Sequence, residues 1–545
     1  MRETHKTIHN PILKGFNPDP SIVRVGDDYY IATSTFEWYP GVQIHHSRDL
    51  VNWRLASRPL NRPEQLDLRG NPDSCGVWAP CLTYADGLFW LAYSDVKRRE
   101  GNFKDVHNYL VTAPSIEGPW SDPVYLNSSG FDPSLFHDED GRKWVVNLVW
   151  DHRARPTKFG GILLQEFDPR AGKVIGEAVN IFRGSPLGLT EGPHLYRRNG
   201  YYYIVTAEGG TGYRHALSMA RSRSITGPYE LHPDWHVVTS RFFPDTELQR
   251  AGHGDFVETQ DGECYVVHLT GRPLAGLNRC PLGRETTIQK AQWGDDGWLR
   301  LCGNPLEPKT EVPAPNLPPH PFPVEAARHD FDSPELPSAF QWLRTPYPER
   351  IFSLTARPGF LRLTGRESVG SWFEQALIAR RQTAFAYDAE TVVEASPKSY
   401  QQMAGLIAYY NRFAFHYLAL TFDETVGTCL HVFSCLGDWP DGRLTVLLES
   451  PVKVPEGQAV RLRVEVRGCA LRFFYALESD SDDWKRIGPV LDASLLSDEA
   501  GQGEHGNFTG AFVGMAAHDV SGQAMTADFD YFVYSDCVDH QDVVA

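Results

Sequence analysis

Apolar residues occur in short runs along the first three hundred residues, and turn residues separate the runs in a pattern that recurs five times. Each unit has a brief apolar run, a turn containing glycine, and a second run rich in aromatic and β-branched residues. Asn-Gly and Asp-Gly between such runs predict β-hairpins, because tight turns need the positive φ angles that these residues tolerate. The second runs span residues 29–32, 89–93, 143–146, 201–205 and 264–267.

A short marker segment opens each unit. The first is Asn-Pro-Asp-Pro-Ser at 17–21, and its variants lie at 78–80, 131–134, 191–194 and 252–255. Marker positions 20, 80, 133, 193 and 254 are 60, 53, 60 and 61 residues apart. Five nearly equal units of about four strands each, without long amphipathic helices, predict a five-bladed β-propeller. Because the first strand of each blade lines the central axis, we expect the five markers to converge at one end of the channel.

Asp19 stands between two prolines in the first marker. Each proline restricts its own φ and disfavours the helical region for the residue before it. We therefore expect an extended backbone at Asp19 and a carboxylate presented rigidly at the entrance to the first hairpin.

The pattern changes after residue 307. Residues 308–324 contain seven prolines, which predict a semi-rigid linker. Beyond them the period is lost, while alternating or apolar runs at 360–364, 405–410 and 460–466 predict strands at irregular spacing. We therefore predict an all-β chain with a propeller domain over 1–307, the linker over 308–324, and a β-sandwich over 325–540.

Composition excludes several classes of partner. The chain of 545 residues carries a net charge of -17, which argues against nucleic acid and anionic membranes, because both need basic surfaces. The charged N-terminus leads into no apolar segment, and no stretch approaches the ~20 apolar residues of a membrane span. The nine cysteines form no Cys-x-x-Cys pair. These features predict a cytoplasmic protein without a disulfide framework.

Three of the five markers carry a carboxylate, at Asp19, Asp132 and Glu191. A single Asp before Pro commonly caps a turn, but three like charges at one channel mouth cost energy that a structural element avoids. Such a cluster suits glycoside hydrolysis, in which one acid protonates the leaving oxygen and another group acts from across the ring.

Aromatic side chains near the blade entrances favour a sugar over an ion. Phe36, Trp78 and Trp150 offer flat apolar faces, although a single aromatic residue is more often part of a core. The residues leave a second interpretation open, in which the acids and His253 hold Ca²⁺ or Mg²⁺ through oxygens and waters.

Taken in order, five motifs resemble those of glycoside hydrolase family 43, and the chain is most similar to its two-domain β-xylosidase branch. The motifs are Asn-Pro-Asp-Pro-Ser (17–21), Val-Trp-Ala-Pro (77–80), Gly-Phe-Asp-Pro-Ser (130–134), Thr-Glu-Gly-Pro-His (190–194) and Leu-Gly-Arg-Glu-Thr (282–286). The resemblance extends to Gly-Asn-Phe-Thr-Gly-Ala-Phe at 506–512 in the second domain. It implies a five-bladed propeller followed by a β-sandwich of the concanavalin or lectin type that contributes to the active-site pocket.

The resemblance also implies roles for the site residues. Asp19 is expected to be the general base that activates water, and Glu191 the general acid. Asp132 is expected to hold Glu191 in position and to keep its pKa high by charge repulsion.

The remaining residues of the implied site contact the substrate. Arg284 is expected to bind substrate hydroxyls or pair with an acid, and His253 to lie beneath the sugar as a polar contact or a ligand of water or metal. Phe508 is expected to close the pocket from the sandwich. The resemblance implies no required cofactor and leaves Ca²⁺ at His253 as an alternative.

The implied activity is exo-acting, inverting release of xylose from the non-reducing ends of 1,4-β-xylo-oligosaccharides, as in xylan degradation, by a homodimer or homotetramer. The nearest alternative is an α-L-arabinofuranosidase or an enzyme with both activities. The alternative outside enzymes is a sugar-binding propeller with a structural cation.

Overall fold

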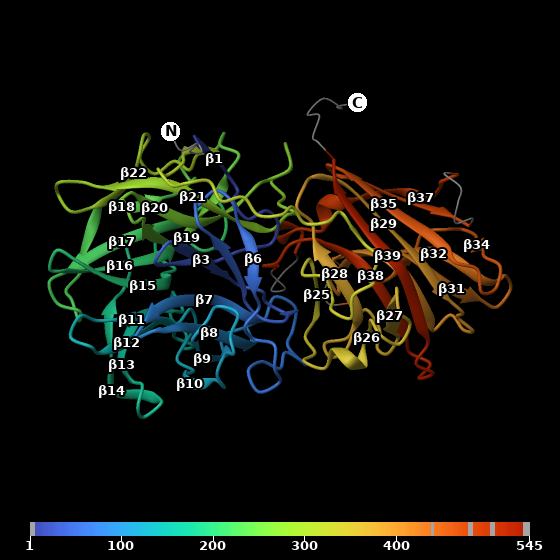
Figure 1. Ribbon diagram of the computed structural model, residues 1–545, viewed down its shortest axis with the longest axis horizontal. Helices are drawn as coiled ribbons and strands as arrows, with labels where there is room; N and C mark the ends of the chain where they lie inside the picture. The colour runs from blue at the N-terminus through green and yellow to red at the C-terminus, as the bar shows by residue number, and fades with distance from the viewer. Residues whose placement is uncertain (1–5, 438–440, 478–482, 502–506, 538–545) are drawn as a thin grey trace.

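The computed structural model describes residues 6–437, 441–477, 483–501 and 507–537 (Figure 1). Strands make up nearly all of the regular structure, and within these ranges the helices are three short 3₁₀ turns, Pro348–Arg350, Ala493–Leu495 and Asp498–Ala500. Five four-stranded sheets form the first half of the molecule, at the left in Figure 1, and two larger sheets form the second. No helix in the described ranges is long and apolar enough to cross a membrane.

Each blade consists of four antiparallel strands in chain order, which confirms the predicted five-bladed propeller. Blades one and two contain β2 (Ser21–Val25), β3 (Asp28–Thr33), β5 (Gln43–Ser47), β6 (Arg54–Ser57), β7 (Gly76–Ala85), β8 (Leu88–Arg98), β9 (Asp105–Ala113) and β10 (Val124–Asn127). Blades three to five contain β11 (Ser134–His137), β12 (Lys143–Trp150), β13 (Phe159–Asp168), β14 (Lys173–Phe182), β15 (Glu191–Arg198), β16 (Tyr201–Glu208), β17 (Ala216–Ser222), β18 (Glu230–Val238), β19 (Gln249–Glu258), β20 (Cys264–Gly271), β21 (Arg284–Trp293) and β22 (Leu299–Leu301).

The hairpin turns have the geometry that their residues predict. Asp86 and Gly87 have φ angles of 55° and 77°, and Asn199 and Gly200 have φ angles of 50° and 74°. Two successive positive φ angles are characteristic of the type I′ turn, whose twist matches that of the flanking strands.

The innermost strands of neighbouring blades contact one another in a closed ring, β2 to β7 to β11 to β15 to β19 and back to β2. The N-terminal segment, which precedes blade one, also contacts blade five and so connects the first blade to the last. β1 (Thr7–His9) pairs with β23 (Glu311–Pro313), and Leu13 forms a bridge to Thr286 of blade five. The proline-rich segment therefore contains a strand that is bound to the propeller.

The second half of the chain forms a two-sheet sandwich. One sheet contains β26 (Phe352–Ser353), β27 (Leu361–Thr364), β39 (Thr526–Asp536), β29 (Ala386–Ala395), β35 (Val460–Arg467), β36 (Ala470–Ala476) and β37 (Lys485–Asp492), with β24 (Arg328–His329) beside β39. The other contains β33 (Thr445–Val446), β32 (Gly427–Leu436), β31 (Ala414–Asp423), β30 (Gln402–Asn411), β38 (Phe512–Asp519), β28 (Ala376–Arg381), β25 (Phe340–Leu343) and β4 (Trp38–Tyr39), with β34 (Val452–Lys453) beside β32. Buried and partly exposed positions alternate along β35, as its sequence predicts.

The strand β4 comes from the N-terminal half and completes a sheet of the sandwich. Trp342 pairs with Tyr39 and Leu343 with Trp38, and the Trp38 ring stacks on Phe512 with 3.6 Å between centroids. All of these aromatic rings are buried. The two halves of the molecule thus share a sheet and part of a core.

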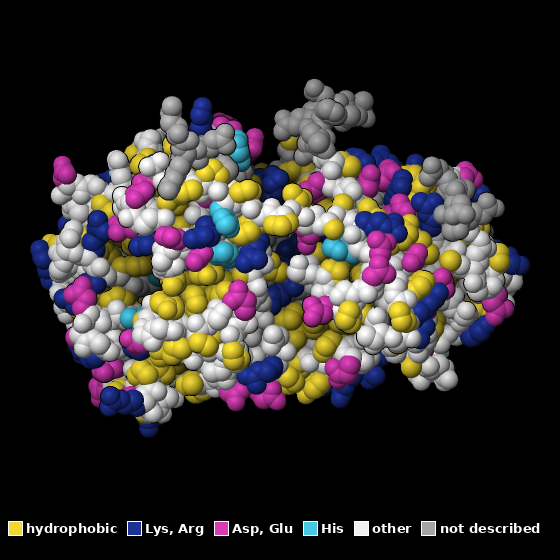
Figure 2. Space-filling view, viewed as in Figure 1, with side chains coloured by type: hydrophobic (Ala, Val, Ile, Leu, Met, Phe, Trp, Pro, Cys, Tyr) yellow, Lys and Arg dark blue, Asp and Glu magenta, His cyan; other side chains and the backbone are white. Residues whose placement is uncertain are grey.

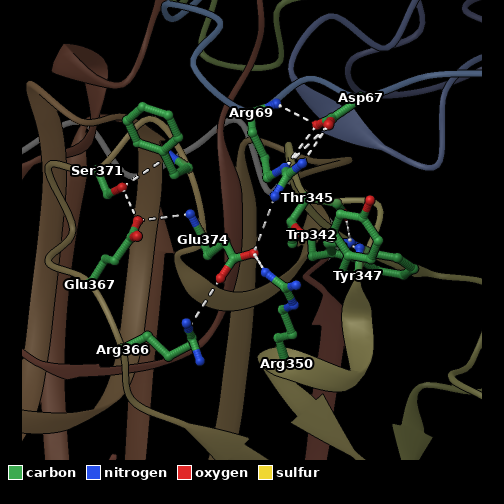
Figure 3. A network of polar contacts seen from close by, with 11 residues as sticks. Asp67, Arg69, Trp342, Thr345, Tyr347, Arg350, Arg366, Glu367, Ser371 and Glu374 are labelled. Carbon is green, nitrogen blue, oxygen red and sulfur yellow. Dashed lines mark hydrogen bonds and ion pairs between the residues drawn. The ribbon is translucent and has the colours of Figure 1, made fainter. Parts of the chain in front are cut away.

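Charged residues form a further contact between the two halves (Figure 3). Arg69 lies before β7 and pairs with Asp67 at 2.7 Å, and its Nη1 lies 3.8 Å from Glu374 Oε1 of the sandwich. Arg350 and Arg366 lie 2.9 and 3.2 Å from the same carboxylate. Elsewhere, Figure 2 shows acidic and basic side chains interspersed over the visible face.

Candidate active site

A cavity of about 220 Å³ opens where the innermost strands of the blades begin. All nine residues for which the sequence predicts a site role line it: Asp19, Phe36, Trp78, Asp132, Trp150, Glu191, His253, Arg284 and Phe508. The other lining residues are Arg99, Lys104, Phe131, Phe159, Gly210 and Thr211. The predicted convergence of the markers is therefore what the structure shows.

The backbone at the markers differs from the expectation. Asp19 has a φ of 56°, Asp132 of 57° and His253 of 39°, so all three lie in the left-handed region. The predicted extended conformation at Asp19 is wrong. Short polar side chains such as Asp tolerate this region better than most residues, and the resulting sharp turn places the carboxylate in the cavity.

Asp19 lies among hydrogen-bond donors and is almost completely buried. Arg284 Nη1 donates to Asp19 Oδ1 at 2.8 Å, and Ser34 Oγ donates to Oδ2 at 2.7 Å. Burial opposes ionisation, but the Arg284 charge and the Ser34 hydrogen bond help to outweigh it, so the pKa of Asp19 lies below its ordinary value. Asp19 is therefore a carboxylate at neutral pH.

Glu191 has the opposite electrostatic environment. Burial raises its pKa to about 8, and the negative charge of Asp19 contributes in the same direction. The charge that raises the pKa of Glu191 is therefore that of Asp19 and not, as expected from the sequence, that of Asp132. The pKa of Asp132 is also well above its ordinary value, first through burial and then through repulsion by Glu191. Because two ionised carboxylates in this pair repel each other, the pair retains a proton near neutral pH.

Asp132 also determines the backbone geometry next to Glu191. Its Oδ2 accepts a hydrogen bond from the Gly192 amide at 2.9 Å, across the boundary between blades three and four. Gly192 has a φ of 55°, and a Cβ there would lie 2.8 Å from Cε1 of His253. Glycine thus lets the His253 ring pack against the turn that carries Glu191.

His253 lies beside Asp19 in the lining of the cavity. Its Nδ1 is 3.9 Å from Asp19 Oδ1, and burial lowers the pKa of His253 to about 4. The ring is therefore neutral at neutral pH. Within the described ranges, no group of three or more His, Cys, Asp and Glu side chains is arranged to hold a metal ion.

Aromatic rings form the walls of the cavity. Trp78 lies 5.9 Å from Phe36, 5.3 Å from Phe131 and 6.4 Å from Phe508, measured between ring centroids. Trp150 lies 6.1 Å from Phe131. Apolar walls around a polar floor suit a sugar ring, whose faces are apolar and whose edge carries hydroxyls.

Two cations among the lining residues were not singled out from the sequence. Lys104 Nζ lies 4.4 Å from the centre of the Trp150 ring, and the Arg99 guanidinium lies 4.9 Å from the centre of the Phe508 ring. Burial lowers the pKa of Lys104 to about 8. Both residues belong to the connection between β8 and β9, whose sequence carries no repeated motif.

Comparisons with known proteins agree with this geometry. Residues 8–299 match the family model "Glycosyl hydrolases family 43", and residues 328–535 match the model "Beta xylosidase C-terminal Concanavalin A-like domain". The chain is 60% identical to the "Xylosidase/arabinosidase 43B" of Humicola insolens over 97% of each chain. It is 48% identical to the "Xylan 1,3-beta-xylosidase" of a Vibrio species, covering 97% of this chain and 99% of the relative.

Solved structures are similar over the same length. The crystal structure of xylan beta-1,4-xylosidase from Bacillus halodurans C-125 superposes with a TM-score of 0.94 at 53% sequence identity. The match covers 97% of this chain and 100% of the other. Propeller and sandwich are thus present in that protein as one unit.

Proposed function

We propose, from the premise that the chain belongs to glycoside hydrolase family 43, that it is an exo-acting, inverting β-xylosidase. Its substrate would be a 1,4-β-linked xylo-oligosaccharide, from whose non-reducing end it releases xylose. The observation that carries the proposal is the separation of two pKa values in one small cavity. Asp19 is ionised at neutral pH, whereas Glu191, with a pKa of about 8, retains its proton.

These two charge states supply the groups that inversion needs. Asp19 accepts a proton from a water molecule, whose oxygen attacks the anomeric carbon on the face opposite the leaving group. Glu191 donates its proton to the glycosidic oxygen as that bond breaks. Asp132 acts on Glu191 through its hydrogen bond to the Gly192 amide, while the negative charge of Asp19 helps to keep the pKa of Glu191 high.

The dimensions of the cavity support exo-action. Its volume of about 220 Å³ is below the roughly 300–1,000 Å³ of pockets that enclose drug-sized ligands. It suits one sugar unit, with Phe508 of the sandwich on one side and Trp150 of blade three on another. The remaining sugar units of an oligosaccharide would extend out of the cavity through its opening.

Product analysis by NMR tests the proposal. With xylobiose and xylotriose, we expect xylose to be released one unit at a time, and α-xylose to be the first anomer formed. Asp19→Ala and Glu191→Ala should each slow cleavage of xylobiose by at least about 100-fold. Early β-xylose would contradict inversion, and xylobiose cleavage that survives both substitutions would contradict the roles of Asp19 and Glu191. A wild-type protein that binds xylobiose without cleaving it would favour the sugar-binding propeller instead.

A second activity, on α-L-arabinofuranosides, is favoured by one observation. The relative that is 60% identical bears a name that includes both xylosidase and arabinosidase. Comparing kcat/KM for aryl xyloside and aryl arabinofuranoside measures the preference, and a large preference for arabinose would reverse the assignment. Another relative is named for 1,3-linkages, so 1,3- and 1,4-xylobiose should be compared in the same way.

We also propose that the reaction needs no metal, that the protein works in the cytoplasm, and that it forms a homodimer or homotetramer. The nine free thiols support the second point. Activity unchanged by EDTA would support metal independence, and activity restored by Ca²⁺ after EDTA would overturn it. Light scattering of the purified protein tests the oligomeric state.

A further inference from the structure

Phe508 reaches the cavity from the sandwich, and two propeller side chains hold its backbone. Its amide donates to Ser74 Oγ at 3.1 Å, and its carbonyl accepts from Arg284 Nη2 at 2.8 Å. Nearby, a Cβ on Gly283 would lie 2.3 Å from the Thr509 carbonyl, so the two domains approach as closely as their backbones allow here. The position of the Phe508 ring therefore depends on propeller atoms.

Ser74 also holds a second wall of the cavity. Trp78 Nε1 donates to the Ser74 carbonyl at 3.1 Å, while the Ser74 amide donates to Glu37 Oε2 at 3.1 Å. The amide, carbonyl and hydroxyl of this one buried residue thus each have a partner. Through two of them, Ser74 links Trp78 to Phe508, whose rings lie 6.4 Å apart.

Charges from the sandwich hold the turn that contains Ser74. Asp73 Oδ1 pairs with Arg344 Nη2 at 2.8 Å, and Asp73 Oδ2 pairs with Arg412 Nε at 2.9 Å. Ser74 itself has a φ of 60°, in the left-handed region that non-glycine residues seldom adopt. Such a conformation persists only where surrounding contacts enforce it, and it concentrates at functional sites.

We propose that Ser74 is a positioning residue that sets the affinity of the cavity for xylo-oligosaccharide by holding Phe508 against Trp78. Ser74 is not among the described residues that line the cavity, so it acts through Phe508 and not by contact with the sugar. The inference rests on the proposed β-xylosidase function for its kinetic readout.

Ser74→Gly removes the hydroxyl and leaves the turn favourable, because glycine adopts a φ of 60° readily. The Phe508 amide then loses its buried acceptor. This loss shifts the equilibrium between the held and the displaced position of Phe508 by a factor of roughly 5–30. We expect KM for xylobiose to rise by about that factor. We expect kcat to change by less than about threefold, since Phe508 contacts the sugar equally before and during reaction.

Two matched variants separate positioning from general structural damage. In a Phe508→Ala background, Ser74→Gly should raise KM no further, because the residue through which it acts is gone. Ser47 is an equally buried serine whose Oγ accepts from the Leu50 amide at 2.9 Å, away from the cavity. Ser47→Ala should lower Tm and leave KM unchanged.

A KM for Ser74→Gly within twofold of wild type, or effects of Ser74→Gly and Phe508→Ala that simply multiply, would overturn the inference. A crystal structure of the Ser74→Gly protein supplies a readout that needs no activity. Displacement of the Phe508 ring from Trp78 supports the inference, and an unmoved ring refutes it. If the wild-type protein fails to cleave xylobiose, the proposed function fails while this structural comparison still decides the role of Ser74.

Discussion

Replacing Arg284 with methionine should shift the acidic side of the pH profile of hydrolysis. Arg284 is almost fully buried, and its Nη1 lies 2.8 Å from Asp19 Oδ1. An Arg beside an Asp typically lowers the pKa of the carboxyl group by about 1–3 units, or about 1.4–4 kcal/mol. Without Arg284, burial would raise the pKa of Asp19 with less to oppose it.

The direction of the shift follows from the role of Asp19 as a base. A higher pKa means that Asp19 takes up its proton at a higher pH, so activity is lost earlier as the pH falls. We expect the acidic limb of kcat/KM to move up by about 1–3 pH units. The assay is kcat/KM for an aryl xyloside with an acidic phenol between about pH 4 and 9, because that leaving group makes little demand on Glu191.

Arg272→Met is the matched control. Arg272 Nε donates to Glu285 Oε2 at 2.6 Å, and Glu285 is fully buried on the same blade as Arg284. Either substitution therefore leaves a buried carboxylate without its guanidinium. Arg272→Met should lower Tm without moving the acidic limb. The reasoning is refuted if folded Arg284→Met protein has the acidic limb of the wild type.

Three further substitutions test the same cavity. Glu191→Ala should lower kcat on xylobiose by about 10²–10⁴-fold but affect an aryl xyloside with an acidic phenol far less, and equal losses would contradict its role as acid. Lys104→Met should raise the pKa of Glu191 above about 8, because the positive charge of Lys104 lowers this pKa. The basic limb of kcat/KM should then move to higher pH, and an unmoved limb would disprove the coupling. Gly192→Ala should lower Tm and kcat, since its Cβ would lie 2.8 Å from His253 Cε1. Gly188→Ala, with a φ of 74° and open space around it, controls for backbone strain alone.

The propeller and most of the site residues could be predicted from the sequence, because the repeat shows which residues occupy equivalent positions in different blades. Each marker lies at or near the start of the innermost strand of a blade, so residues as distant as Asp19 and His253 occupy equivalent places around one axis. Two-residue turns such as Asn199-Gly200 added the strand boundaries. Phe131 was also within reach, since it precedes Asp132 in the third marker.

Features that depend on contact between segments distant in the chain could not be predicted from the sequence. Pro18 and Pro20 predict an extended Asp19, but its φ is 56° and its carboxylate is held by Arg284, a contact between distant segments that local preferences do not specify. Arg99 and Lys104 lie in a connection outside the repeat, and only tertiary packing brings them to the cavity. The sequence of β4, Trp38–Tyr39, likewise gives no sign that it joins the sandwich.

The site is best understood as a product of the interface between the two domains. Arg250 of blade five shows this as well, because it pairs with both Asp498 and Glu499 of the sandwich at 2.9 Å. Its Nε also donates to the carbonyl of Thr211, which lines the cavity. Buried ion pairs between sandwich and propeller therefore hold residues next to the cavity. An isolated propeller would lack the sandwich partners of Asp73 and Arg250, so it would lose the contacts that hold the cavity along with Phe508.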